Sequence, residues 1–110
     1  MRLPNSERAV VDIAKLRDYC LDATHPRGRH KARAFGGALN LIAADAGDLR
    51  NAILASVQLA VAVETDADEL GSRFTAVITV SRRGRSAGVR TAWIIRRGKD
   101  CPRLTNCCVL

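Results

Sequence analysis

Residues 74–95 read FTAVITVSRRGRSAGVRTAWII, and this stretch decides the fold. Apolar and polar residues alternate from Phe74 to Ser81, as they do in a strand with one buried face. The alternation stops at Arg82-Arg83-Gly84-Arg85, where Gly84 can supply the positive φ of a tight turn, and resumes from Ala87 to Ile95. The stretch therefore predicts a β-hairpin.

Two further strands are expected on either side of this hairpin. Downstream, Lys99 to Pro102 predicts a turn and Arg103 to Val109 a strand. Upstream, a weaker strand is expected at about Leu59 to Glu64, followed by an acidic stretch at 64–69. With the hairpin, these segments predict a four-stranded antiparallel sheet.

Before these strands the apolar residues recur at helical spacing. A short helix is expected after Asp12, a good N-cap, and should end before Ala23-Thr24-His25-Pro26. A second is expected from about Arg29 to Leu39, weakened by Gly36-Gly37, and a third after Asp45. We therefore predict an α+β fold in one domain, residues 1–110, with about three N-terminal helices packed on one face of the sheet.

Positive charge is concentrated in residues 73–103. This segment holds nine Lys and Arg residues against one acid, Asp100, a formal charge of +8, whereas the whole chain carries +7. Such a concentrated field favours binding to phosphate polymers. The nine are Arg73, Arg82, Arg83, Arg85, Arg90, Arg96, Arg97, Lys99 and Arg103.

Several classes of protein are disfavoured by the sequence. No apolar run approaches the roughly 18 residues of a transmembrane helix, and no signal-peptide pattern opens the chain, so we expect a cytoplasmic protein without membrane contact. The four cysteines lack metal-ligand spacing and are expected to be reduced. The terminal Cys107-Cys108-Val109-Leu110 matches a prenylation box, but it continues a periodic segment and reads as a strand. No metal and no cofactor are expected.

Strand parity predicts which side chains share the open face of the sheet. If Leu104 faces the helices, then Arg90, Arg103, Thr105 and Cys107 lie on the opposite face. Guanidinium groups there can hold phosphate oxygens through forked hydrogen bonds, and a hydroxyl can orient one of them. The alternative is that these exposed strand positions are simply polar.

A second basic cluster occupies residues 25–33, HPRGRHKAR, at the start of the second expected helix. Cations at a helix N-terminus oppose the helix dipole, so the cluster is typical of a site for a bound anion. Histidine can both accept and donate a proton close to neutrality. The alternatives are that His25 caps a turn and that His30 points to solvent.

Spaced motifs across the chain resemble a family of small bacterial domains of unknown function, found beside small partner genes and at the ends of larger toxin-like proteins. More distantly, the order of helices and sheet is similar to the superfamily of barnase, EndoU, colicin and RelE ribonucleases. That resemblance implies an active site on the open face of a four-stranded sheet. The motifs are 15–19 (KLRDY), 25–28 (HPRG), 31–33 (KAR), Phe35, 89–93 (VRTAW) and 102–105 (PRLT).

The resemblance implies a toxin-like endoribonuclease that needs no metal and cleaves RNA by attack of a ribose 2′-OH on the adjacent phosphate. The residues carried over as catalytic are His25 as general acid or base, Lys31, Arg103 and Thr105. Those expected to hold the nucleic acid are Arg27, Arg29, His30, Arg33, Arg90 and Arg96. Expected partners are RNA and an acidic antitoxin or immunity protein, with the oligomeric state open.

Two alternatives remain at this point. A non-catalytic nucleic-acid-binding module needs the same basic surface but no positioned histidine. A protein-interaction module would use that surface to dock an acidic partner.

Overall fold

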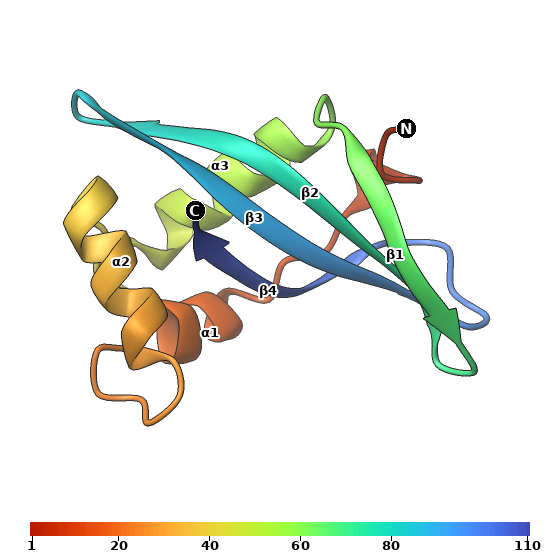
Figure 1. Cartoon of the computed structure of the whole chain (residues 1–110), viewed down its shortest axis with the longest axis horizontal. Helices are drawn as coiled ribbons and strands as arrows, with labels where there is room; N and C mark the ends of the chain where they lie inside the picture. Colours follow the sequence, from red (N-terminus) through yellow and green to blue (C-terminus); the bar gives the residue numbers. More distant parts are fainter.

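A computed structural model describes all 110 residues and shows three helices followed by a four-stranded antiparallel sheet (Figure 1). The strands lie in the order β1-β2-β3-β4, so each is the neighbour of the next in sequence. This confirms the α+β class. The helices are α1 (Ile13–Lys15), which continues into a π-helical turn (Leu16–Cys20), α2 (Arg29–Leu39) and α3 (Ala46–Val57); the strands are β1 (Ala62–Asp68), β2 (Gly71–Arg82), β3 (Arg85–Arg96) and β4 (Arg103–Val109).

The hairpin of β2 and β3 is the longest paired unit of the molecule. It is paired from Gly71 opposite Arg96 to Arg82 opposite Arg85, which makes it longer than the alternating pattern indicated. Arg83 (φ 49°) and Gly84 (φ 80°) both have positive φ in the connecting turn. Two successive residues with positive φ match the right-handed twist of the strands. The hairpin prediction is confirmed, with Arg83 sharing the conformation expected of Gly84 alone.

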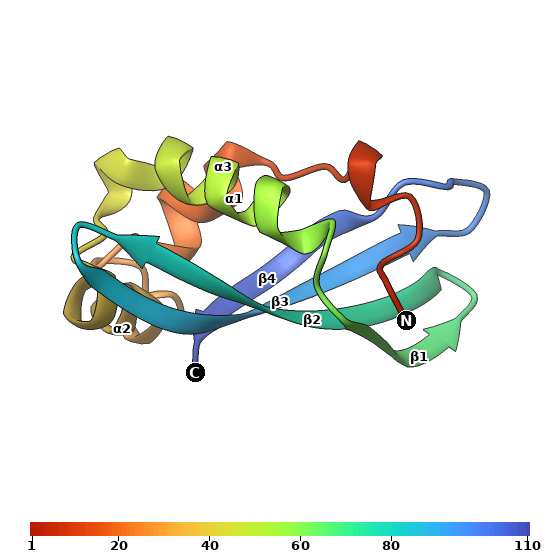
Figure 2. The ribbon, with the colours of Figure 1, turned by 90° about the horizontal axis from the view of Figure 1, so that it is seen from above.

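Residues of the helices and of the sheet form one buried apolar core. α1 and α3 lie over the same face (Figure 2), and α2 lies at one end of the sheet, against β3 and β4. The side chains predicted to share a face on α3, Leu49, Ile53 and Val57, are all buried. They join one core cluster with Phe35 of α2 and Trp93 of β3. Such contiguous burial is the main source of stability for a chain of this length.

A buried hydrogen-bond chain fixes the centre of the hairpin. Thr91 and Trp93 are 0% and 1% exposed. The Trp93 indole Nε1–H donates to Thr91 Oγ1 at 2.8 Å, and the Thr91 hydroxyl donates to the Ala76 carbonyl at 2.6 Å. Because each polar atom has a partner, the largest side chain of the core is held without a desolvation penalty.

Replacing Thr91 by Val should lower the free energy of unfolding by about 2 kcal/mol, because the buried Trp93 indole N–H loses its acceptor. Urea unfolding followed by tryptophan fluorescence measures this. Thr91→Ser is the matched control, since it keeps the hydroxyl and loses only a methyl group. A Val variant as stable as the Ser variant would show that this hydrogen bond contributes nothing.

A β-bulge in β4 changes which side chains face the core. Ala92 pairs with Asn106 but Trp93 pairs with Leu104, so Thr105 is an extra residue between two rungs. An extra residue shifts the alternation by one position. Cys107 is therefore buried on the same side as Leu104, and the prediction that it lies on the open face is wrong.

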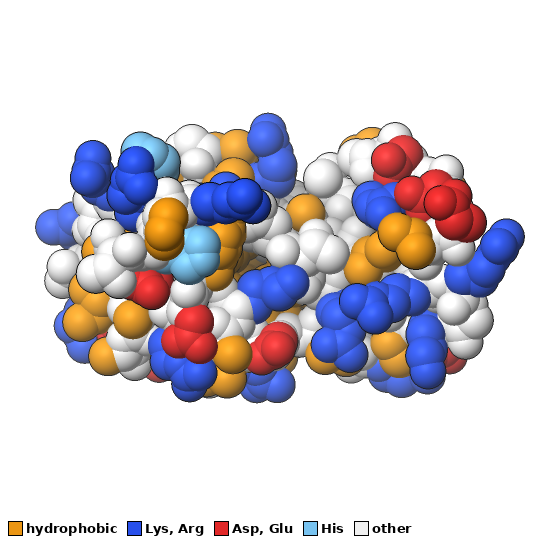
Figure 3. Space-filling model, turned by 90° about the horizontal axis from the view of Figure 1, so that it is seen from below, with side chains coloured by type: hydrophobic (Ala, Val, Ile, Leu, Met, Phe, Trp, Pro, Cys, Tyr) orange, Lys and Arg blue, Asp and Glu red, His pale blue; other side chains and the backbone are white.

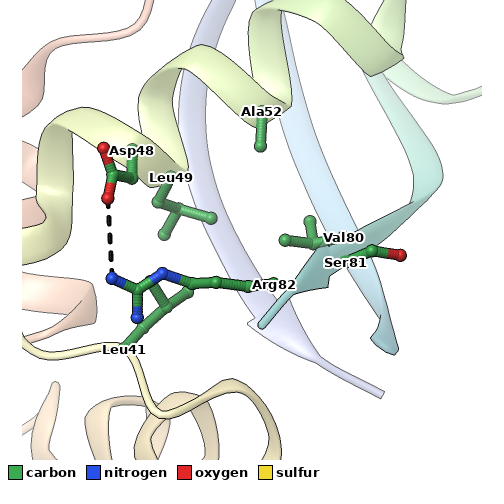
Figure 4. A pocket seen from close by; sticks show the side chains of 7 residues that line it. All are labelled: Leu41, Asp48, Leu49, Ala52, Val80, Ser81 and Arg82. Atoms are coloured by element: carbon green, nitrogen blue, oxygen red, sulfur yellow. Dashed lines mark ion pairs between the residues drawn. The ribbon is translucent and has the colours of Figure 1, made fainter. Parts of the chain in front are cut away.

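Arg82 is a structural arginine rather than part of an open basic surface. Its side chain is only 12% exposed and pairs with Asp45 at 3.0 Å and with Asp48 at 3.5 Å. Figure 4 shows the pair with Asp48 of α3. It also donates to the Asn40 carbonyl at 2.9 Å, beyond the end of α2. The pocket beside it, about 170 Å³ and lined largely by apolar side chains such as Leu49, has no cation free to bind a ligand.

Arg73 is also paired within the sheet. The strand expected at about Leu59 to Glu64 is wrong in its bounds, because β1 runs to Asp68 and takes in part of the acidic stretch. This places Asp68 at 2.8 Å and Asp66 at 3.5 Å from the Arg73 guanidinium. The excess charge of residues 73–103 is therefore partly neutralised by acids from outside that segment.

Candidate functional site

The loop before α2 is organised by the imidazole of His25. His25 Nδ1 accepts hydrogen bonds from the backbone N–H of Arg27 at 3.0 Å and of Gly28 at 2.9 Å. A neutral imidazole has a single lone pair, so Nδ1 is the acceptor and Nε2 carries the hydrogen. The turn-capping alternative is therefore realised, and the Nε2–H of the half-buried ring remains as a hydrogen-bond donor.

Tyr19, in the π-helical turn after α1, brings the two key residues of the second basic cluster together. Its ring meets the His25 ring edge-on, with 4.8 Å between centroids and 73° between planes. Lys31 Nζ lies over the same ring, 6.0 Å from its centroid. Gly28 allows this approach, since a Cβ there would lie 2.1 Å from the Tyr19 carbonyl oxygen. His25 and Lys31 are thus gathered at one aromatic side chain.

Tyr19 also faces β4. An open pocket of about 300 Å³ is lined by Lys15, Tyr19, Thr105 and Asn106, and we name it the Tyr19 pocket. Thr105, the extra residue of the bulge, is exposed here. The structure therefore places His25 and Lys31 of the helical half on the same side of the molecule as Thr105.

Two lysine charges act on a buried cysteine next to Tyr19 in sequence. Cys20 and Cys107 are both buried, and Cys20 Sγ lies 3.8 Å from the Asn106 side-chain oxygen. A hydrogen bond from Cys107 lowers the pKa of the Cys20 thiol, and the charges of Lys31 and Lys15 lower it further. The same pairing, with burial, raises the pKa of Cys107. Both lysines therefore act on the same buried group, the Cys20 thiol.

Arg103 lies apart from the Tyr19 pocket. With Arg96 and Lys99 it lines a separate pocket where β3 leads into β4, which we name the Arg103 pocket. Neither Arg103 nor Arg96 is among the residues that line the Tyr19 pocket. Of the predicted catalytic residues, Thr105 lines the Tyr19 pocket and Arg103 lines the Arg103 pocket. His25 and Lys31 line neither pocket and lie against the Tyr19 ring.

The remaining predicted nucleic-acid contacts are exposed. Arg29 donates to the Pro26 carbonyl at 2.6 Å and so helps to shape the loop. Arg90 lies on the open face of the sheet, paired with Cys108 of β4 and lining a small pocket with Ala92. Arg27, His30 and Arg33 flank the His25 loop or lie on α2 and are exposed to solvent.

The distribution of charge agrees with two separate clusters. Figure 3 shows Lys and Arg side chains gathered at both ends of the molecule, with the histidines at one end and less charged surface between them. No three His, Cys, Asp or Glu side chains gather in a way that could hold a metal ion. None of the helices is both long and apolar enough to cross a bilayer.

Sequence reasoning missed Lys15, Tyr19 and Asn106 as site residues. A signal was present for two of them, because Lys15 and Tyr19 are four residues apart and therefore share one helix face. Tyr19 is half-buried and lines the pocket. Asn106 lies on the open side only because the bulge shifts the alternation by one residue. No local sequence pattern predicts this bulge.

Comparison with known proteins gives a family for this arrangement. The family model described as Domain of unknown function (DUF6883) matches residues 2–110. The chain belongs to the DUF6883 family. No curated protein and no solved structure shows significant similarity to it. The family covers nearly the whole chain, and its description assigns no activity, so the function of this DUF6883 domain has to be argued from the site itself.

Proposed function

We propose that this DUF6883 domain is a toxin-like endoribonuclease that cleaves RNA without a metal, by attack of a ribose 2′-OH on the adjacent phosphate. The supporting observation is the convergence of three segments on Tyr19. Its ring is flanked by His25 and Lys31, and its pocket is completed by Thr105. Cations and hydrogen-bond donors around one open pocket suit the negative charge that develops on a phosphorane.

The proposed roles follow the geometry of each side chain. Lys31 and Lys15 stabilise the charge that grows on the phosphate, and the Thr105 hydroxyl and the Asn106 side chain hydrogen-bond its oxygens. His25 acts through its Nε2–H as a donor to the phosphate, because its only lone pair is taken by the backbone of the loop. This replaces the general acid or base role that the sequence suggested for His25. The P–O5′ bond breaks as the 2′-oxygen bonds to phosphorus, solvent water takes the proton of the 2′-OH, and water supplies a proton to the departing 5′-oxygen.

The cations outside the Tyr19 pocket would hold the RNA backbone. Exposed guanidinium groups bind phosphate oxygens whatever the base sequence, so they add affinity and salt dependence without selectivity. Such a surface also suits an acidic antitoxin or immunity protein as inhibitor, through complementary charge. The residues proposed for this role are Arg27, Arg29, His30, Arg33, Arg90, Arg96 and Arg103.

Incubating the full chain with end-labelled single-stranded RNA in excess chelator tests the proposal. The expected result is cleavage that persists at every chelator concentration and leaves 2′,3′-cyclic phosphate ends, because the 2′-oxygen is the nucleophile. The same oligonucleotide with 2′-O-methyl groups is the control and should stay intact. Cleavage of that methylated strand would rule out the proposed attack.

Replacing His25 separates its two roles. His25→Ala removes the acceptor of two backbone N–H groups and should lower the free energy of unfolding by about 1 kcal/mol. His25→Asn keeps a side-chain acceptor for the loop and should be nearly as stable as the native chain. Both should cleave RNA about 10-fold more slowly, since each lacks the Nε2–H donor. Thermal unfolding and initial rates measure the two effects.

A loss of about 10²–10⁴-fold in the cleavage rate of both variants would instead restore His25 as a general acid or base. The cleavage rate of the native chain should then depend on pH as the titration of a single group does.

A non-catalytic RNA-binding module is the second candidate. It is favoured by one observation, that the His25 lone pair is occupied within the loop. This candidate predicts an affinity that falls steeply with salt and no product in the cleavage assay.

A further inference from the structure

The Arg103 pocket is a cavity of about 230 Å³ at the end of the sheet where β3 leads into β4. Three cations line it, Arg96, Lys99 and Arg103, and Val10 and Ile94 supply apolar wall. It shares no lining residue with the Tyr19 pocket. It is therefore a second basic cavity rather than an extension of the first.

The three cations of this pocket have no acidic partner. None of them takes part in an ion pair, and all are exposed. The acid beside them, Asp100, is already engaged by the Arg8 guanidinium at 3.0 Å. The Cys101 thiol and Arg8 hold the pKa of Asp100 below its usual value, so it remains an ionised partner of Arg8. The surplus positive charge is thus left for an anion from outside the chain.

The wall of the pocket is fixed by backbone hydrogen bonds. The Val10 N–H donates to the Pro102 carbonyl at 2.9 Å, and the Leu104 N–H donates to the Val10 carbonyl at 3.0 Å. The N-terminal segment is thereby bridged to β4 beside Arg103. An anion entering the pocket would meet a wall that is already in place, which reduces the entropy lost on binding.

The position of the pocket relative to the Tyr19 pocket suggests its ligand. Arg103 and Thr105 are two residues apart on β4, a separation of at most about 7 Å along the chain. We propose that the Arg103 pocket binds a second phosphate group of a single-stranded RNA chain whose neighbouring phosphate occupies the Tyr19 pocket. This inference rests on the proposed function, which identifies the polymer as RNA. It adds a subsite that aligns the RNA chain along β4.

Binding of an uncleavable strand tests the subsite directly. The probe is a single-stranded RNA with 2′-O-methyl groups, titrated into the full chain at several salt concentrations. Arg103→Gln should raise the Kd about 10-fold and reduce the slope of log K against log salt by about 0.7, the value for one single-strand phosphate contact. The matched control is Arg83→Gln in the β2–β3 turn, which removes one exposed, unpaired charge far along the hairpin. It should change the Kd less than 2-fold.

Each outcome decides between the pocket and a diffuse field. Equal losses in the Arg103 and Arg83 variants would overturn the proposal, because net charge alone would then account for binding. Inorganic phosphate is expected to weaken binding of the RNA strand no more than another salt does at the same ionic strength. This result would support a site for the polymer. Stronger competition by inorganic phosphate, together with a Kd for the strand that Arg103→Gln does not change, would assign the pocket to a free anion and overturn the proposal.

The subsite and the cleavage reaction can fail separately. An Arg103→Gln effect on the methylated strand, in a chain that never cleaves unmodified RNA, would keep the subsite and remove the reaction. Cleavage by a chain whose affinity is unchanged by Arg103→Gln would remove the subsite and keep the reaction.

Discussion

Replacing Lys31 by Met should lower the rate of RNA cleavage by about 10²–10³-fold, the range seen when one positioned donor to a developing negative charge is removed. Lys31 Nζ lies 6.0 Å from the centroid of the Tyr19 ring. Its charge also lowers the pKa of the thiol of Cys20, the residue after Tyr19. The loss should appear in kcat, because the interaction strengthens as charge moves onto the phosphate.

The control for Lys31 is a second cation on the same helix. Arg33 is exposed and lies two residues further along α2. Arg33→Gln removes the same charge from the chain and should raise KM less than 10-fold with kcat unchanged, as expected of a backbone contact. Thermal unfolding should show both variants folded. Equal effects of the two substitutions on kcat would remove Lys31 from the chemical step.

The fold could be predicted because its main signals are local. The alternation over residues 74–95 and the Gly84 turn are enough to define a hairpin, and the apolar spacing of Leu49, Ile53 and Val57 is enough for α3. The bulge at Thr105 could not be predicted, because no Gly or Pro marks it. One extra residue moved Cys107 from the predicted open face into the core.

The candidate site depends on contacts that sequence spacing does not encode. His25 and Lys31 lie close in sequence, so their nearness could be expected, but their meeting at Tyr19 follows from the fold of the loop against the π-helical turn. The charge count of residues 73–103 overestimates the number of cations free to bind a ligand. Arg73 and Arg82 are paired with acids that lie outside this segment. Only tertiary structure distinguishes a paired arginine from one free to bind phosphate.

Replacing Gly28 by Ala should lower the free energy of unfolding by about 3 kcal/mol and slow RNA cleavage about 10²-fold. The backbone of Gly28 has ordinary helical angles (φ −79°, ψ −16°), so the cause is not conformational. A Cβ would lie 2.1 Å from the Tyr19 carbonyl oxygen and 2.9 Å from its carbonyl carbon, which are backbone atoms that cannot rotate away. The loop must therefore move off the π-helical turn, with the cost of overpacking.

The slower cleavage is expected in addition to the lower stability, because the loop carries His25 and leads directly into Lys31. A displacement of about 1 Å at this contact moves both side chains relative to Thr105, and misplacement on that scale can cost about 10²-fold in rate. Gly37→Ala is the matched control, since it lies in α2 with nothing within 4 Å of the added Cβ. It should stabilise the chain by about 0.5–1 kcal/mol through helix propensity and leave cleavage unchanged. A Gly28→Ala chain with native stability and a native rate would show that the loop does not need its close approach to Tyr19, and the convergence on which the proposed site depends would lose its structural basis.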